Sequence, residues 1–232
     1  MSALNDFLVT RVLPLSGAVY RDFTAYLRDA DAFFDRQGRR NAPCLRSALF
    51  GLLMAAMLML LGLPGMRQAG IDISNEFLIF GTVLNWMLLV VYGGAYWLGA
   101  RVLNGRGGFL AVVNSFFFVS IFLVFLKLFE IPTRALKLRM MAESCGVGGD
   151  FGARVTQTIA ADGSLLLTES LVLLGYLLFL YQAYRMQVRL HGFGRLRGFV
   201  SAVLGTLLLA FVVSKVQEPA IHALVCGYSK TG

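Results

Sequence analysis

The sequence predicts an all-α polytopic membrane protein, a bundle of about five transmembrane helices preceded by an amphipathic interfacial helix. Three observations predict this class. Of the 232 residues, 57% are hydrophobic and 15% are charged, whereas a soluble domain is about 45–50% apolar and about 25% charged. The mean hydropathy is +0.70. Five apolar runs come close to the roughly 20 residues that a helix needs to cross a bilayer core about 30 Å thick.

These five runs are the predicted spans, and the only charged residue within them is Glu169, in the fourth. Each run is continuously apolar rather than alternating. This favours helices, because a helix satisfies its backbone hydrogen bonds within one segment. The first run is short, so an arrangement of four spans, with this run re-entrant or interfacial, stays open. The predicted spans are residues 47–64, 77–100, 107–126, 164–184 and 198–214.

The transmembrane bundle is expected to occupy residues 47–232, after an inner N-terminal segment of residues 1–46. Within residues 15–36 a helix would have one apolar face and one face with charges of both signs. This helix either packs under the bundle or binds a partner or the membrane surface. The first 14 residues are not expected to be a secretory signal, because charges interrupt a short apolar core. The apolar face comprises Val19, Phe23, Leu27, Ala30 and Phe34, and the polar face comprises Arg21, Asp22, Arg28, Asp29 and Asp35.

The distribution of basic residues predicts the orientation. With the N-terminus inside, the inner segments are residues 1–46, 101–106 and 185–197, and they hold most of the 21 Lys and Arg residues. The bias is clearest in the two short turns, where the positive-inside rule is strongest. The N-terminus is therefore expected inside and the C-terminus outside. The net charge of +8 has the same origin and does not indicate nucleic-acid binding.

The longest connection, residues 127–163, is expected to be an outer loop. Residues 132–141 mix apolar and basic side chains, a composition typical of an interfacial helix, and the glycine-rich run at 145–150 ends it. This run is not a phosphate-binding loop, because no Gly-Lys-Ser/Thr follows it.

Glu169 is the most informative candidate for chemistry. A carboxylate in a span is costly and usually faces a partner charge, the bundle interior or water. Lys127 and Lys215 are predicted at the same outer level and are its candidate partners, with Glu130 and Glu218 nearby. The group is a polar site for an ion, a proton or a headgroup, a buried or interfacial ion pair that holds three spans together, or a carboxylate that snorkels to the membrane surface.

Other polar and small residues in the spans indicate helix packing. Asn85 and Asn114 are candidates for hydrogen bonds between helices, with substrate contact as the alternative. Small residues four positions apart permit close approach of two helices. They are Ala95 with Gly99, Gly198 with Ala202, and Ser201 with Gly205.

The topology predicts a disulfide between Cys145 and Cys226, which both lie outside, whereas Cys44 lies inside with reducing solvent. Two free thiols are the alternative, because separation in sequence does not give distance in space. The cysteines and the two histidines, His191 and His222, show no metal-ligand spacing. No metal or other cofactor is expected.

The second and third spans form one helical hairpin, and the fourth and fifth form another. Tyr96 and Phe109 flank the first hairpin turn as Tyr184 and Phe199 flank the second. This correspondence indicates a parallel internal repeat.

These turns, the pair Phe33-Phe34 ahead of Pro43, and the order of five spans after an inner N-terminus together resemble the Yip (Ypt-interacting protein) family, particularly its bacterial members. The resemblance covers roughly residues 30–214. It implies a non-enzymatic role, no catalytic residues, and a bacterial inner membrane as the location.

Three functions stay open. A non-enzymatic scaffold or accessory protein, with the lipid bilayer and another membrane protein or a second copy as partners, is the leading hypothesis. A small transporter or permeation protein that uses the polar site near Glu169 is the alternative. An intramembrane enzyme is the third, and no catalytic motif supports it.

Overall fold

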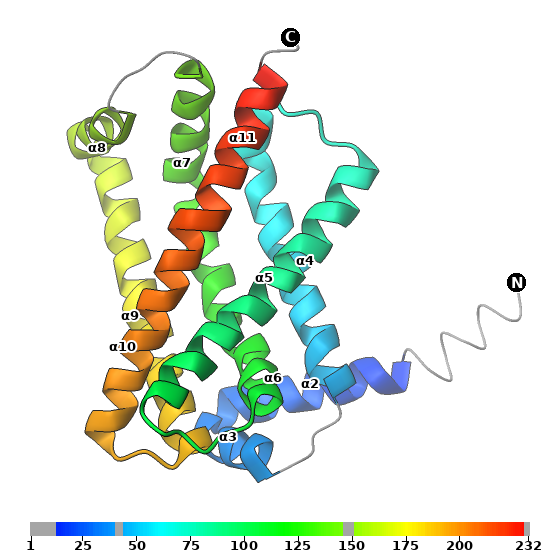
Figure 1. The fold of residues 1–232 in the computed structure, drawn as a ribbon. Helices are drawn as coiled ribbons and strands as arrows, with labels where there is room; N and C mark the ends of the chain where they lie inside the picture. Colours follow the sequence, from blue (N-terminus) through cyan, green and yellow to red (C-terminus); the bar gives the residue numbers. More distant parts are fainter. Residues whose placement is uncertain (1–12, 40–43, 146–150, 230–232) are drawn as a thin grey trace, which may run out of the picture.

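The computed structural model describes residues 13–39, 44–145 and 151–229, and these residues are helical without strands. Helices α2 and α3 lie across one end of a bundle of long helices, while α8 and α11 lie at the other (Figure 1). We call these the α3 end and the disulfide end. The elements are α2 (Leu13–Arg28), α3 (Ala30–Arg39), α4 (Cys44–Gln68), α5 (Asn75–Val102), α6 (Phe109–Val119), α7 (Ile121–Glu143), α8 (Phe151–Ala161), α9 (Gly163–His191), α10 (Arg195–Val212), the π-helix η2 (Val213–Gln217) and α11 (Glu218–Ser229).

Five helical stretches are long and apolar enough to cross a membrane, so the chain is an integral membrane protein of the predicted all-α polytopic class. The first run belongs to this set, which favours five spans over four. Each stretch ends beyond the predicted span, and all but the third also begin before it. The reason is that apolar runs mark the part that lipid surrounds and the helices continue into polar ends. The stretches are Leu45–Gln68, Asn75–Val102, Phe109–Glu143, Gly163–His191 and Arg195–Gly227.

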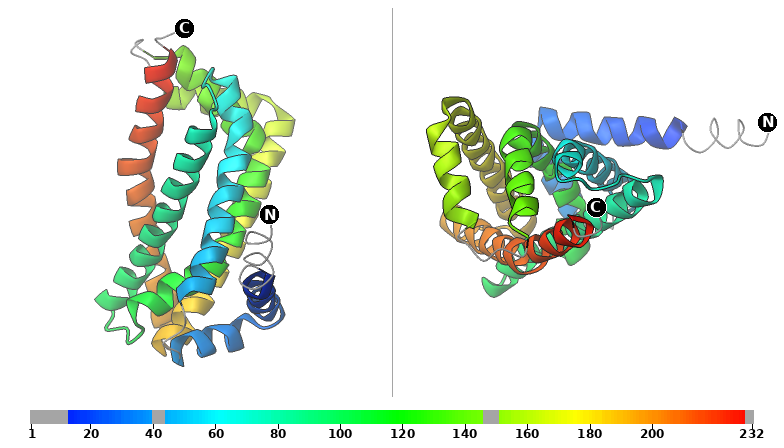
Figure 2. Two further views of the ribbon diagram at one scale, coloured as in Figure 1. Left: turned by 90° about the vertical axis from the view of Figure 1, so that its right-hand side faces the viewer. Right: turned by 90° about the horizontal axis from the view of Figure 1, so that it is seen from above.

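The third span, α6 followed by α7, lies in the middle of the bundle. Seen from the disulfide end, α7 lies between α4 and α9, and it packs on both (Figure 2). Around α6, an aromatic layer fills the core: Phe118 stacks on Phe50 with ring centroids 4.5 Å apart, and Phe116 packs edge-on against Phe179. Such rings bury a large apolar area each, so this layer contributes to the stability of the bundle.

The predicted outer loop differs from the structure at its start. Residues 127–143, predicted as loop with a separate interfacial helix, continue the third span as one helix to Glu143. Pro132 lies inside this helix. A membrane helix tolerates proline where neighbouring helices compensate for the lost backbone hydrogen bond. As a result, Arg134 and Lys137 are on the same helix as Lys127 and Glu130.

The predicted amphipathic helix is divided into α2 and α3 at Asp29, whose side chain accepts a hydrogen bond from the Ala32 N–H at 3.0 Å. This is an N-cap interaction that starts a new helix. Because α3 begins in a new direction, the predicted apolar face is not continuous: Ala30 and Phe34 are buried, but Leu27 is 60% exposed. Tyr26 is buried in its place.

Helices α5 and α10 approach each other closely at small residues. A Cβ atom on Gly99 would lie 2.8 Å from the backbone nitrogen of Gly205 and 3.1 Å from the carbonyl oxygen of Ser201. The close approach predicted from small-residue spacing is therefore an internal contact of this chain. Gly198 packs instead on Val188 of α9, where an added Cβ would lie 2.3 Å from Cγ2.

The last span changes from α-helix to π-helix at η2, between α10 and α11. Pro219 follows two residues later and has no N–H to donate to the carbonyl of Lys215. A local π-helix is a common way to accommodate such a missing bond.

Candidate functional site

Glu169 of α9 pairs with Lys137 of α7, with Nζ 3.2 Å from Oε1. The sequence-based expectation was a pair with Lys127 or Lys215, and in the structure neither is bonded to Glu169. The difference arises because residues 132–141 are part of the third span rather than a separate interfacial helix. The continuous α7 lays Lys137 beside the first part of α9.

Lys127 and Glu130, both candidates from the sequence, form a salt bridge with each other one turn apart on α7. Arg134 and Lys137 follow them at positions that share the same face of the helix. Arg134 is close enough to interact electrostatically with both Lys127 and Glu130. We call the four residues Lys127, Glu130, Arg134 and Lys137 the α7 charge stripe.

The stripe lies in the disulfide-side half of the membrane. Glu169 precedes Arg189 by roughly 20 residues, or about 30 Å along the helix, which is one bilayer core. Because Arg189 lies at the α3 end, Glu169 and Lys137 lie near the opposite boundary of the apolar region. Lys127 is about 15 Å further along α7 toward the α3 end. The stripe therefore runs from the membrane boundary inward.

Two tyrosines and a glutamine extend the polar region beyond α7. The Tyr92 hydroxyl of α5 donates a hydrogen bond to Oε1 of Gln217 in η2. Tyr92 also interacts electrostatically with Arg134, and Tyr176 of α9 with Glu130 and Glu169. Electrostatic interactions and one hydrogen bond thus connect polar side chains of α5, α7, α9 and η2. Sequence reasoning missed Tyr92, Arg134, Tyr176 and Gln217, which lie on four different elements.

Lys215 and Glu218, the remaining candidates for this site, are exposed on η2 and at the start of α11. No salt bridge joins either of them to another described residue. Both are therefore excluded from the cluster.

Cys145 and Cys226 form a disulfide, with Cα atoms 5.5 Å apart and a sequence separation of 81. This is the pair that the topology predicts. It joins the end of α7 to α11, next to a small core in which Val225 and Leu138 are buried. The bond therefore closes the bundle on the side where the α7 charge stripe reaches the membrane boundary.

A second charged group lies at the α3 end. Asp31 of α3 accepts hydrogen bonds from Arg185 Nε at 2.8 Å and Arg189 Nη2 at 2.9 Å, and Arg189 also lies 3.6 Å from Asp35. Burial alone would raise the pKa of Asp31, but the two arginine contacts outweigh it and lower this pKa below its ordinary value. Sequence reasoning missed this group. The signal was present: two acids four residues apart match two arginines four residues apart.

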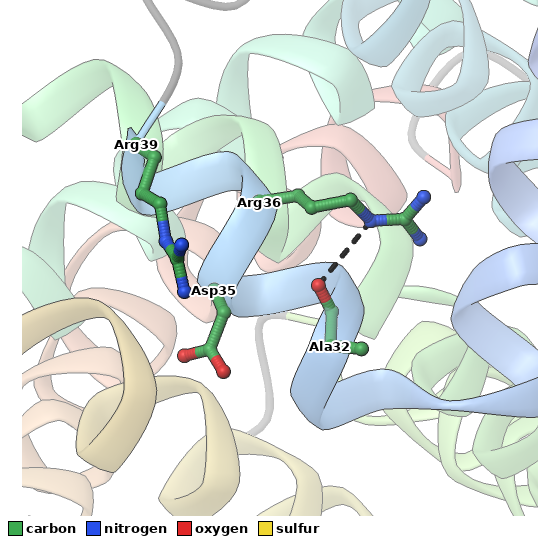
Figure 3. Close-up of a pocket in the computed structure, with 4 residues that line it drawn as sticks. All are labelled: Ala32, Asp35, Arg36 and Arg39. Carbon is green, nitrogen blue, oxygen red and sulfur yellow. Dashed lines mark hydrogen bonds between the residues drawn. The ribbon is translucent and has the colours of Figure 1, made fainter.

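Aromatic side chains also hold α3 in the bundle. Phe33 and Phe34 are buried, and Phe33 packs on Phe118 of α6 with ring centroids 4.7 Å apart. The outer side of α3 forms an open hollow of about 470 Å³ lined by Ala32, Asp35, Arg36 and Arg39 (Figure 3). Arg36 turns back to donate to the Ala32 carbonyl at 3.3 Å. We call α2 and α3 together the α3 platform.

Polar contacts also connect the two hairpin turns at the α3 end. The Nδ1 atom of His191 accepts a hydrogen bond from the Gly107 N–H at 2.9 Å, which joins the turn after α9 to the turn before α6. One turn further from the α3 end, the Gln187 side chain of α9 donates a hydrogen bond to the Tyr96 carbonyl of α5 at 3.0 Å. Of the two predicted asparagine contacts, Asn114 is buried. No hydrogen bond to Asn85 occurs within the described part of the chain.

A second open hollow, about 430 Å³, lies at the α3 ends of α9 and α10 and is lined by Tyr184, Arg195, Leu196 and Phe199. Two of these residues flank the predicted repeat turn. Within the described ranges, no three His, Cys, Asp or Glu side chains are arranged to hold a metal ion. The arrangement offers charged and hydrogen-bonding groups rather than a nucleophile with its base.

Comparison with known proteins finds no match to this chain. No protein-family model matches the chain, no curated protein matches it, and no solved structure matches its fold. The two charged groups and the α3 platform are the features of the molecule that bear on function.

Proposed function

We propose that this protein is a non-enzymatic scaffold or accessory protein of a bacterial inner membrane and that the α3 platform is its contact surface for another membrane protein or a second copy. The observation that carries this proposal is the attachment of the platform. Two arginines of α9 hold Asp31, and buried rings hold the same helix from the other side. A short helix fixed in this way presents Asp35, Arg36 and Arg39 in a defined geometry, which lowers the entropic cost of binding.

The orientation supports the same proposal. The short turns at the α3 end carry Arg101, Arg106, Arg195 and Arg197, and short basic loops remain on the cytoplasmic side. With the N-terminus inside, the α3 platform faces the cytoplasm and the disulfide faces the oxidising side. The resemblance to the Yip family, in which the Phe33-Phe34 pair takes part, is a further argument for an accessory role.

Site-specific photocrosslinking tests the proposal. A photoreactive residue at Arg39, on the exposed rim of α3, is expected to capture a partner in native membranes, and the same partner is expected to co-purify in mild detergent. Thr156 of α8, exposed at the disulfide end, is the matched control and is expected to capture none of it. Equal capture at both positions, or a monomer without a partner, would contradict the proposal.

A permeation protein is the second candidate, and the α7 charge stripe is the observation that favours it. Ionisable side chains in a span often mark an ion or substrate pathway. The discriminating measurement is solute or proton flux in proteoliposomes with the parent and the Glu169→Gln variant. Altered flux in a variant of unchanged thermal stability would support this candidate over the scaffold.

A further inference from the structure

We propose that Arg134 is the centre of a binding site for a phosphate-type anion at the disulfide end of the bundle. The proposal does not depend on whether the protein is a scaffold or a permeation protein.

The charge balance of the cluster is the first argument. The α7 charge stripe and Glu169 supply three cations and two carboxylates. Lys127 pairs with Glu130, and Lys137 pairs with Glu169. Arg134 is the remaining cation, and within the described ranges it has no salt bridge or hydrogen bond. Arg134 shares the Glu130 carboxylate with Lys127 rather than having a carboxylate of its own. A partly buried cation in excess is costly, so an external anion would balance the group.

The chemistry of the arginine side chain selects the kind of anion. A guanidinium presents five N–H donors in a planar fork that matches the oxygens of a phosphate or carboxylate. Lys137, one turn away on the same face, adds a further cation. The Tyr92 hydroxyl of α5 is engaged with Gln217. With three cations against two carboxylates, the group carries a net positive charge, which favours an anion over a metal ion or a neutral solute.

The depth of the site fits a phospholipid headgroup. Arg134 lies three residues, or about 4.5 Å, from Lys137 along α7, and Lys137 lies near the boundary of the apolar region. Lipid phosphates occupy this level, and basic pockets between transmembrane helices bind them. A free phosphate ion from solution has the same chemistry, so the experiment includes both sources.

The test uses the purified full-length protein with its disulfide intact. Thermal unfolding is measured while dioleoyl phosphatidylglycerol or inorganic phosphate is titrated, with dioleoyl phosphatidylcholine and sodium chloride at equal ionic strength as controls. In the parent, at least one phosphate probe is expected to raise the unfolding temperature in a saturable manner. Arg134→Gln is expected to weaken the apparent affinity about tenfold or more, the effect of losing charge-assisted hydrogen bonds.

Arg139→Gln is the matched control. Arg139 is on the same helix, pairs with Glu143 at 2.9 Å, and is exposed, so the same substitution removes one charge outside the cluster. Its affinity is expected to equal that of the parent. If only phosphatidylglycerol raises the unfolding temperature saturably, the ligand is a lipid headgroup. If inorganic phosphate does so as well, the site accepts a free anion. No saturable effect of either probe, or an equal loss in both variants, overturns the proposal.

A second measurement needs no variant. Phenylglyoxal modifies accessible arginines, and peptide mapping gives the rate of modification at Arg134 and at Arg139 in the parent protein. The bound probe is expected to protect Arg134 and to leave Arg139 unchanged. Absence of protection at Arg134, or equal protection at both positions, overturns the proposal even if Arg134→Gln fails to fold.

Discussion

At the scale of single residues, Asp31 shows how one carboxylate attaches a surface helix to a membrane bundle. It is about one-third exposed, so its two ion pairs are weaker than fully buried ones, and we expect a contribution of about 1 kcal/mol. The pKa of Asp31 is lowered in the folded protein. The contribution is therefore complete above the ordinary Asp pKa of about 3.9 and is lost as the pH falls through the folded-state pKa.

Asp31→Asn is therefore expected to lower stability by about 1 kcal/mol between about pH 5 and pH 8 and to approach the parent as the pH falls below about 4. Thermal unfolding in detergent across this pH range measures the difference. Asp22→Asn is the control, because among the described residues Asp22 has one ion pair, a 3.9 Å contact with the partly exposed Arg46. A difference that stays constant down to pH 3 would rule out the ionic origin of the effect.

The pair Glu169–Lys137 makes a second prediction at this scale. Glu169→Gln and Lys137→Met are expected to destabilise the protein by similar amounts and to be non-additive, with a coupling energy of about 0.5–1 kcal/mol. A double-mutant cycle by thermal unfolding gives this value. Lys215→Met, in the exposed part of η2, is expected to leave stability unchanged and to add to Glu169→Gln without coupling. Coupling to Lys215 in place of Lys137 would refute the observed pairing.

At the scale of elements, α7 depends on its connection to α11. Intact-mass analysis after alkylation without reductant is expected to show one alkylated cysteine, Cys44, in protein from its native membrane. The variant Cys145→Ser/Cys226→Ser is expected to lose up to about 4 kcal/mol, the chain-entropy value for a closed loop of about 80 residues. Three alkylated cysteines would show that the bond does not form in the native membrane.

The contact between α5 and α10 makes a prediction about helix packing. Gly99→Ala would place a Cβ 2.8 Å from the backbone of Gly205, so the helices must move apart, at a cost of about 1–3 kcal/mol. Gly17→Ala in α2 meets no atom within 4 Å and is expected to be neutral or stabilising by up to about 1 kcal/mol through helix propensity. Thermal unfolding of both variants gives the comparison, and equal stability of the two would argue against the close approach.

At the scale of the whole molecule, the orientation in the membrane decides which end meets which compartment. A reporter that is active only outside is expected to work after Gly232 and within residues 145–163, and to fail within residues 101–106. The reason is that the short basic turns are retained in the cytoplasm. Reporter activity at residues 101–106 would reverse the orientation and place the α3 platform outside.

The parts of the site that sequence reasoning reached are those with a local signal. Glu169 was identifiable because it is the one charge in an apolar run. The disulfide pair was identifiable because the predicted topology places Cys145 and Cys226 on the outer side and Cys44 on the inner side. Lys137 was not identified as the partner of Glu169, because Pro132 and the mixture of basic and apolar residues favoured a separate helix there. Arg134 was missed for the same reason.

By itself, the sequence determined the class of the protein and the approximate place of its spans. Lipid cannot satisfy backbone polar groups, so an apolar run of sufficient length must be helical, and this constraint is readable one segment at a time. Only the tertiary structure decided which charges meet. On α7, lysines occur at 127 and 137, and the register between α7 and α9 selects between them. That register is set by packing such as Leu126 against Gly175, where an added Cβ would lie 2.8 Å away. Contacts of this kind depend on the shapes of two helices far apart in sequence, and no single segment contains them.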